Sequence, residues 1–325
     1  MSDQDKETVQ SAANAAAEVS WERALIEKVM MANLTEQRRA RRWNLFFRFL
    51  MVGLVVLLLL SSLPALWSDP TLSGKRFTAL IDVQGVISQE SAASADIIVS
   101  GLRAAFEHDN TAGVILRINS PGGSPVQSGY INDEIYRLKE AHPDIPVYAV
   151  IQDMCASGGY YIASAADDIY ADKASLVGSI GVVMDGFGFV DGMQKLGIDR
   201  RLYTAGEHKG FLDPFSPSDP AEVEHISTLL NEIHQQFINT VLKGRRDRLS
   251  SDADLFSGYV WTGEQGLELG LVDGLGSSSY VAREIIGAEE IVNFTPRRNY
   301  LDRLAERMGA GVSAFMRSNT GLILR

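Results

Sequence analysis

Residues Asp153 to Ala165 read DMCASGGYYIASA and follow an apolar run, Pro146 to Gln152, that is typical of a buried strand. Gly158 and Gly159 then open a run of small and aromatic residues that predicts a helix. Ser157 is therefore expected at a strand-to-helix turn, where a hydroxyl can project into a cleft and the first helical N–H groups can bind a developing oxyanion. The same pattern fits an ordinary helix N-cap, since serine often caps helices. Alone, this stretch leaves both interpretations open.

Patterns typical of strands and helices alternate around this turn. Short apolar runs predict strands at residues 77–87, 113–118 and 147–151, and helical patterns at 92–108 and 126–141 separate them. Such alternation predicts an α/β fold with a largely parallel sheet that helices cover on both faces. Loops at the carboxyl ends of parallel strands often build functional sites, so the turn is expected at such an edge.

The second half of the chain predicts longer irregular stretches between its elements. We expect a glycine-punctuated apolar segment at 176–183, a helix at 186–196, a strand at 200–203, a long amphipathic helix at 221–249, and a helix at 263–269 that leads into a strand-like end at 271–276. After residue 295, arginines among apolar residues predict a basic amphipathic helix. That helix could pack on a partner subunit, lie on anionic lipid, or be an ordinary surface helix.

A glycine loop follows the strand expected at 113–118. Asn119 to Ser124 reads NSPGGS, which fits an ordinary Pro-Gly turn. It equally fits a loop in which Gly122 and Gly123 present backbone N–H groups to a substrate carbonyl, because side chains there would crowd that carbonyl. Since this loop and the Ser157 turn both follow strands, they are expected at one edge of the sheet.

The composition excludes some classes of function. The chain has 325 residues, a formal net charge of -11 and 46% hydrophobic residues. The acidic charge argues against nucleic acid as the main partner. A single cysteine, Cys155, excludes an intrachain disulfide and a multi-cysteine zinc site, and we expect no metal or cofactor. Cys155 could be proposed as a nucleophile, but nothing nearby favours a thiolate, so we interpret it as a packing residue.

The N-terminal part of the chain predicts a membrane anchor. Residues 1–43 form a polar tail, and a basic cluster leads into the apolar run Phe49 to Leu66. With its apolar flank, this run predicts an anchor at 44–67, long enough for a tilted helix to cross a bilayer of about 30 Å. Because the arginines precede the run, the positive-inside rule places the tail in the cytoplasm and the chain beyond the linker 68–76 in a bacterial periplasm. A cleaved signal peptide is the alternative, but its n-region is usually far shorter than this tail.

A serine nucleophile needs a positioned base, because its hydroxyl is weakly nucleophilic near neutral pH. None of the five histidines lies between Ser157 and Glu207, so a Ser-His-Asp site would need His208 or a more distant histidine. A lysine is the alternative. Since an unperturbed lysine has a pKa of about 10.4, a lysine base requires a closed, mostly apolar site and a hydroxyl that orients the amine.

Five motifs of this chain occur in the order found in the S49 peptidase family. They are Asn119 to Ser124, Ala156 to Tyr161, Val177 to Val182, Gly206 to Gly210, and Gly258 to Asp273. The chain therefore resembles the short form of this family, which has a single catalytic domain, over residues 77–290. Lys209 lies 52 positions after Ser157, a separation that suits the Ser-Lys pair of that form.

The resemblance implies a serine peptidase site. It implies Ser157 as the nucleophile, Lys209 as the general base and Ser179 as the hydroxyl that orients the lysine amine. The oxyanion donors would be the backbone N–H groups of Gly123 and Gly158, with Gly122 as a further candidate. The family has a ClpP/crotonase-like fold, and in its short form neighbouring subunits of a ring or dome on the membrane supply the serine and the lysine.

The function expected from the resemblance is hydrolysis of signal peptides or other short, unfolded, apolar peptides by a homo-oligomer at the bacterial inner membrane. The peptidase domain at 77–290 would be followed by an extension at 291–325. A crotonase-type acyl-thioester enzyme also fits the glycine loop and the segment WTGEQGLELGLVD at 261–273, but a periplasmic domain would meet no coenzyme A. A non-catalytic membrane scaffold, in which Ser157 is only a helix cap, is a third hypothesis.

Overall fold

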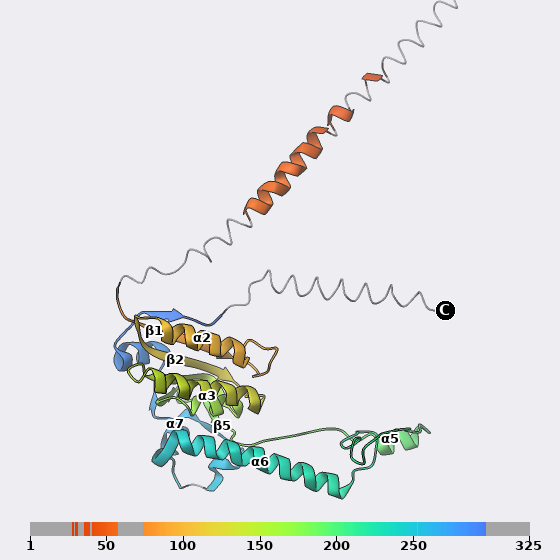
Figure 1. The fold of residues 1–325 in the computed structure, drawn as a ribbon, viewed down its shortest axis with the longest axis vertical. Coiled ribbons are helices and arrows are strands. Elements are labelled where there is room, and N and C mark those ends of the chain that lie inside the picture. The colour runs from red at the N-terminus through yellow and green to blue at the C-terminus, as the bar shows by residue number, and fades with distance from the viewer. Residues whose placement is uncertain are drawn as a thin grey trace, which may run out of the picture. The chain divides into compact units, whose positions relative to one another are not determined.

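The computed structural model describes residues 74–251 and 253–296, together with residues 28, 30–31, 36–39 and 41–57 (Figure 1). The chain divides into two compact units, residues 1–73 and residues 74–325.

The first unit contains a helix over residues 41–57. No helix within the described ranges combines the length and the apolar character that crossing a membrane requires. The anchor expected at 44–67 is described only as far as residue 57, and the rest of it lies outside the described residues. The same holds for most of the tail and for the basic helix expected after residue 295, which is described only up to residue 296.

The second unit is a mixed α/β fold around a mostly parallel sheet. The strand order is β6-β5-β3-β2-β1-β8, and β4 pairs with both β3 and β7. Only the pair of β5 and β6 is antiparallel among the described strands. The strands are β1 (Phe77–Gln84), β2 (Thr111–Ser120), β3 (Val147–Ala156), β4 (Asp168–Ala171), β5 (Leu176–Gly178), β6 (Val260–Thr262), β7 (Gly274–Leu275) and β8 (Ile291–Asn293).

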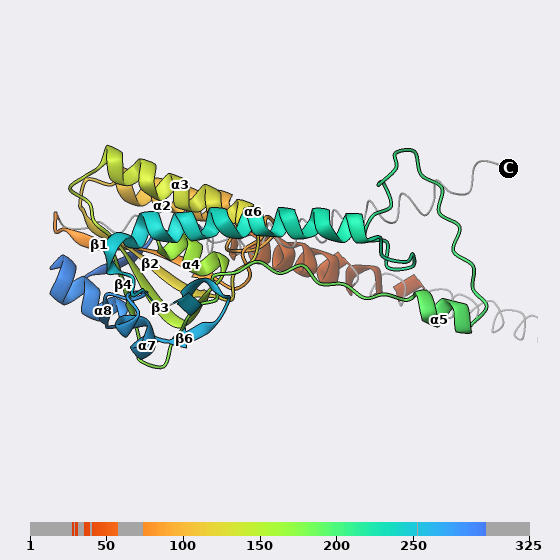
Figure 2. The ribbon, with the colours of Figure 1, turned by 90° about the horizontal axis from the view of Figure 1, so that it is seen from below.

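Helices cover both faces of this sheet, as the alternating pattern predicts. Figure 2 shows α2, α3 and α6 on one side of the sheet and α8 on the other. The helices are α2 (Ala95–Glu107), α3 (Pro125–Ala141), α4 (Gly158–Ala163), α5 (Val190–Lys195), α6 (Pro220–Arg245), α7 (Gly263–Glu268) and α8 (Ser278–Tyr280), with short 3-10 turns at Arg246–Arg248 and Ala253–Phe256 and a π-helical turn at Val281–Ile286.

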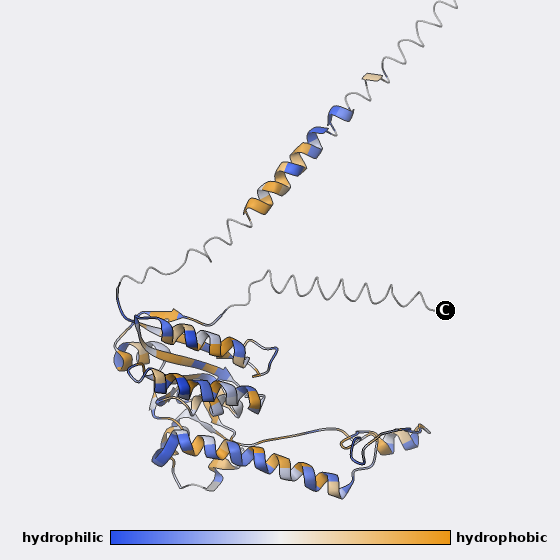
Figure 3. Ribbon diagram, in the orientation of Figure 1, coloured by the Kyte–Doolittle hydropathy of each residue, from blue (hydrophilic) through white to orange (hydrophobic). Residues whose placement is uncertain are grey.

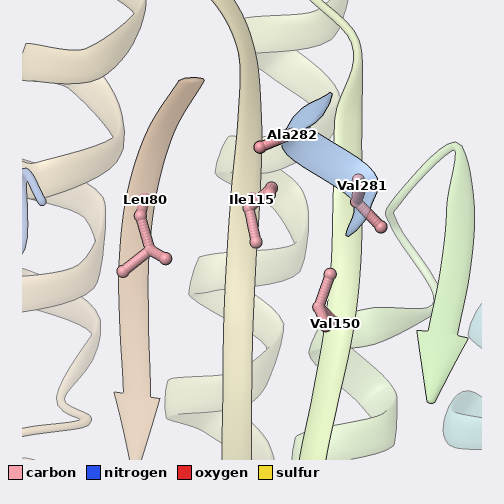
Figure 4. Packing of buried hydrophobic residues seen from close by; sticks show 5 residues of the cluster. All are labelled: Leu80, Ile115, Val150, Val281 and Ala282. Carbon is pink, nitrogen blue, oxygen red and sulfur yellow. The ribbon is translucent and has the colours of Figure 1, made fainter. Parts of the chain in front are cut away.

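The core sits on the apolar faces of the central strands. On one face, Leu80, Ile115 and Val150 come from three neighbouring strands and pack against Val281 and Ala282 (Figure 4). β1 and β2 are buried along most of their length, which explains why apolar residues predominate in their sequences. The surface helices differ, because α3 and α6 carry hydrophilic and hydrophobic residues side by side (Figure 3).

Strand β3 positions the site because it changes partner along one edge. Residues 148–150 pair with β4, whereas residues 154–156 pair with β5. The carboxyl end of β3 is therefore held between β2 and β5, and the turn into α4 starts from that end.

One expected element is wrong. The segment at 200–203, predicted as a strand, has no strand structure, and its residues are exposed. Leu202 and Tyr203 match strand propensity, but a strand needs a partner for its backbone groups, and no described strand pairs with this segment.

Candidate active site

Ser157 lies at the turn between β3 and α4. Its φ of 52° and ψ of -122° are rare for a residue with a side chain. Two backbone hydrogen bonds hold the turn: the Ser157 N–H donates to the Gly178 carbonyl at 2.8 Å, and the Tyr161 N–H donates to the Ser157 carbonyl at 3.0 Å. Ser157 occupies the N-cap position of α4, but its side chain makes no capping hydrogen bond. The hydroxyl is therefore not used for capping.

Backbone strain coincides with the two serines that the sequence singles out. Within the described part of the chain, four non-glycine residues have a positive φ, and Ser157 and Ser179 are two of them. Such conformations cost about 1–3 kcal/mol each and cluster at functional sites. Ser179 directly follows β5, and its N–H donates to the Tyr259 carbonyl at 2.7 Å, so the β5–β6 pair fixes its position.

The glycine loop packs directly against the Ser157 turn. A Cβ atom on Gly122 would lie 2.7 Å from the Ser157 Cβ atom. A Cβ atom on Gly158 would lie 3.2 Å from the backbone nitrogen of Gly123. Gly122 and Gly123 also have positive φ angles of 100° and 149°. Glycine is therefore required here both for the backbone conformation and for the close approach of the two segments.

Two backbone amides beside Ser157 have no acceptor. The N–H of Gly122 donates to the Ser120 Oγ atom at 3.1 Å, so this amide is already engaged. The N–H groups of Gly123 and Gly158 donate to no acceptor among the residues that the structure describes. Gly158 is the first residue of α4, where the helix offers its N–H no internal partner. Unpaired amides of this kind are the donors that an oxyanion hole uses.

Ser157, Ser179, Gly123 and Gly158 line one cleft, whose volume is about 740 Å³. Residues of α3 and α6 form further parts of its lining. The four residues come from three separate segments, so the topology of the sheet edge brings them together, as expected for loops that follow parallel strands.

Lys209 does not line this cleft. It lies in the segment of residues 181–219, which we call the arm, between α5 and α6, and its side chain is exposed. The lining of the cleft, drawn from the described residues, contains no lysine and no histidine. His208 lies in the arm as well, where its Nδ1 atom is 3.4 Å from the Glu222 carboxylate. The described wall of the cleft therefore contains neither of the two kinds of base considered from the sequence.

Cys155 packs in the core. It is fully buried, and burial raises the pKa of its thiol well above the ordinary range. A thiol held in its neutral form is a poor nucleophile. The geometry therefore agrees with the interpretation of Cys155 as a packing residue.

Two tyrosines fix the short helix that follows Ser157. Tyr160 is fully buried, and its hydroxyl donates to the Leu271 carbonyl at 2.8 Å. The Thr240 hydroxyl on α6 donates to the Tyr161 hydroxyl at 3.0 Å. Because both contacts start from α4, the orientation of the first turn of α4, and with it the Gly158 amide, depends on packing far along the chain.

The cleft includes residues that sequence reasoning missed. α3 contributes Val126, Gly129, Tyr130 and Asp133, and α6 contributes Ile233 and Phe237 among others. The spacing of the α3 residues places them on one helical stripe, a signal that the sequence does carry. The sequence does not show that this stripe faces α6.

No group of three or more histidine, cysteine or carboxylate side chains suited to a metal occurs in the described residues.

Comparisons with known proteins give one family and several relatives. The model of peptidase family S49 matches residues 139–291. A Synechocystis relative is 32% identical over 213 residues, which cover 65% of this chain and 74% of that protein. Protease 4 of Haemophilus influenzae is 33% identical over 219 residues, or 66% of this chain and 35% of that protein.

A Brucella abortus protein named Na(+)/H(+) antiporter NhaA is also similar, with 43% identity over 209 residues. The match covers 64% of this chain but 28% of that protein. The chain spans half or less of the first curated relatives it matches.

Proposed function

Because the chain belongs to peptidase family S49, we propose that it is a membrane-anchored serine endopeptidase with Ser157 as nucleophile and Lys209 as general base. One observation carries the proposal. Ser157 sits in a strained turn, makes no capping hydrogen bond, and lies beside two amides that have no acceptor among the described residues. A helix cap uses none of these features, whereas acyl transfer uses an available hydroxyl and free amide donors for the oxyanion.

The chemistry proceeds through an acyl-enzyme. The neutral amine of Lys209 accepts the proton of the Ser157 hydroxyl as its oxygen attacks a peptide carbonyl carbon. The Gly123 and Gly158 amides donate to the oxyanion that forms, and loss of one such donor typically costs about 3 kcal/mol. When the C–N bond breaks, the leaving amine takes the proton from Lys209. Water then attacks the ester, and Lys209 again transfers the proton. Ser179 orients the amine by a hydrogen bond.

We place Lys209 and Ser157 of one site on neighbouring copies of the chain. Two observations support this arrangement: the described cleft lining holds neither lysine nor histidine, and Lys209 lies on the arm. The arm exposes large apolar side chains, including Val183, Phe187 and Tyr203 at 83%, 78% and 90% exposure. Apolar surface of this kind is typical of a protein–protein contact, and a second copy that covers it would bring its cleft to Lys209.

The fold and the location complete the proposal. A mostly parallel sheet with strained serines at its edge is consistent with a ClpP/crotonase-like peptidase domain at 77–290. The apolar run from Phe49 to Leu66 behind a basic cluster supports an inner-membrane anchor with a periplasmic catalytic domain. The substrates we propose are signal peptides or other short, unfolded, apolar peptides, because a cleft of this size holds an extended segment and not a folded domain.

Hydrolysis by the full chain tests the proposal. We expect Ser157→Ala and Lys209→Ala each to lower kcat/KM for an apolar peptide by about 10⁴-fold or more, because members of such a pair act as a unit. Lys195→Ala, which removes another lysine of the arm, is the matched control and should retain activity. A serine-directed acylating probe should label Ser157. Hydrolysis that survives in either of the first two variants, or wild-type protein that the probe fails to label, would refute the pair.

A further inference from the structure

His234 on α6 binds the segment that joins the core to the arm. Its Nε2 atom lies 3.2 Å from the carbonyl oxygen of Ile180, 54 positions earlier in the chain. A carbonyl oxygen only accepts hydrogen bonds, so Nε2 carries a proton and is the donor. His234 itself does not line the cleft, although Ile233 and Phe237 on the same helix do. It therefore acts on the site through the segment that it holds.

Ile180 marks the point where the chain leaves the core. Its side chain is fully buried, whereas no residue from 181 to 219 is buried. From Gly181 to Gly188, the chain makes no hydrogen bond to any residue that the structure describes. The bond from His234 is therefore the last one that holds the chain before it enters the arm.

The helix α6 leaves the core at the same place. Its buried residues begin at Phe237, and no residue from 220 to 233 is buried. His234 therefore lies at the boundary between the exposed part of α6 and the part that packs on the core. Figure 1 shows α6 and the extended segment before α5 both running away from the sheet toward α5. His234 thus joins the two connections between the arm and the core at their base.

The same bond acts on Ser179, the neighbour of Ile180. Ser179 has a positive φ of 51° and lines the cleft. Its N–H donates to the Tyr259 carbonyl at 2.7 Å, so β6 holds the chain just before this residue, and His234 holds it just after. A strained conformation persists only where its surroundings hold it. Loss of the donor at His234 should therefore loosen both Ser179 and the start of the arm.

We propose that His234 is a positioning residue: it ties α6 to the chain at Ile180, and this tie fixes Ser179 and the direction in which the arm carries Lys209. The effect on hydrolysis rests on the proposed peptidase function, but the tie itself can be measured without hydrolysis.

Hydrogen exchange measures the tie. His234→Phe keeps an aromatic ring but removes the donor, whereas the side-chain amide introduced by His234→Gln can donate to the same carbonyl. We expect the Ser179 amide to exchange about fivefold faster in His234→Phe than in wild type, which corresponds to the loss of one ordinary hydrogen bond. In His234→Gln it should exchange at close to the wild-type rate. If His234→Phe does not fold, His234→Ala removes the donor with a smaller side chain.

His225→Phe is the matched control, because His225 is an exposed histidine on the same helix. It should leave the exchange of the Ser179 amide unchanged. A wild-type exchange rate in His234→Phe would overturn the inference. Equal acceleration in His234→Gln or in His225→Phe would overturn it as well, because the effect would then not depend on the donor at position 234.

Steady-state kinetics measure the consequence for the site. Because His234 does not line the cleft, we expect His234→Phe to lower kcat by about tenfold and to change KM by less than about twofold, since a small displacement of a reacting group slows the reaction strongly. His234→Gln should restore most of kcat. Faster exchange with an unchanged kcat would overturn the role in positioning Lys209. If wild-type protein hydrolyses nothing, the peptidase proposal fails, and the exchange rates still decide whether His234 holds Ser179.

Discussion

The sheet core and the arm belong to the same unit of the chain but differ in how far their residues are buried. The core around β1, β2 and β3 buries most residues of each strand, whereas no residue of the arm at 181–219 is buried. Figure 2 shows the same contrast, with α5 at the far end of α6 from the sheet. The nucleophile, its strained turn and its free amides all belong to the core, and Lys209 belongs to the arm. Under the proposed function, the core supplies the nucleophile and the amide donors of the site. The arm supplies the lysine base and contacts a neighbouring copy of the chain.

The same kind of substitution should therefore change stability more in the core than in the arm. The strongest case is a buried ion pair. Arg245 at the end of α6 is 1% exposed, and its guanidinium contacts both oxygens of Asp273, at 2.6 and 2.8 Å, and the Gly270 carbonyl. We expect Arg245→Ala to lower the free energy of unfolding by about 3 kcal/mol, because it removes a buried guanidinium and leaves the partly buried Asp273 with only Arg248 and the Ile169 N–H as partners. Urea denaturation measures the effect.

The arm supplies the control for this pair. Arg201 lies 3.8 Å from Asp199, and both side chains are exposed, so Arg201→Ala should cost less than about 1 kcal/mol. If Arg245→Ala does not fold, Arg245→Lys keeps the charge but loses the fork of hydrogen bonds and should be clearly less stable than wild type. Similar unfolding free energies for the changes at Arg245 and at Arg201 would remove the contrast between core and arm.

Glycine substitutions give a smaller effect of the same kind. Gly244 touches the backbone of Ser164 under α6, so Gly244→Ala should overpack this contact and cost about 1–3 kcal/mol. A Cβ atom on Gly192 in α5 would meet no other atom within 4 Å, so Gly192→Ala should be neutral or raise stability by up to about 1 kcal/mol. Thermal unfolding of the two variants measures these changes in stability. A loss of stability in Gly192→Ala as large as that in Gly244→Ala would show that the arm is packed within one chain.

The smallest expected effect is a pH dependence. Hydrogen bonds from Arg137 and Arg103 outweigh burial and lower the pKa of Glu134 to about 2. Since the folded value lies below the ordinary one of 4.5, Glu134 stabilises the fold above about pH 4.5, and this contribution is lost as the pH falls toward 2.

Glu134→Gln should flatten the acid limb of the stability curve between these pH values. In the arm, the Ser216 hydroxyl and Arg200 lower the pKa of the partly buried Asp213 by less than that of Glu134 is lowered, and Asp213→Asn should change the limb less. If the acid limb were the same in Glu134→Gln as in wild type, Glu134 would not be the source of the stability lost at acid pH.

The sequence predicts the core well and the arm poorly, for a physical reason. Apolar residues predominate in the strands at 77–84 and 147–156. The sequence therefore predicts buried strands in both places. The segment at 200–203 contains residues that favour strands but has no partner among the described strands, and pairing is a tertiary property that a local pattern does not contain. The change of partner along β3 is likewise not visible in the sequence.

The site divides in the same way. Ser157 and Gly123 could be placed at one edge of the sheet because each follows a predicted strand, whereas Ser179 was singled out only by the family resemblance; the structure brings all three to one cleft. The hydrogen bond from Gly122 to Ser120 distinguishes Gly122 from Gly123, a distinction that two adjacent glycines in a sequence do not reveal. The meeting of α3 and α6 across the cleft depends on how the helices pack, so it is not visible in the sequence.

One measurement tests the division of the site between core and arm most directly. Ser157→Ala chains and Lys209→Ala chains are mixed in equal amounts under conditions where mass measurements confirm mixed oligomers. If each site combines Ser157 of one chain with Lys209 of a neighbour, hydrolysis should return to about a quarter of the wild-type level, because half of the serines and half of the lysines are intact. Mixed oligomers that remain as inactive as either variant alone would contradict the account and place both residues of the site in one chain.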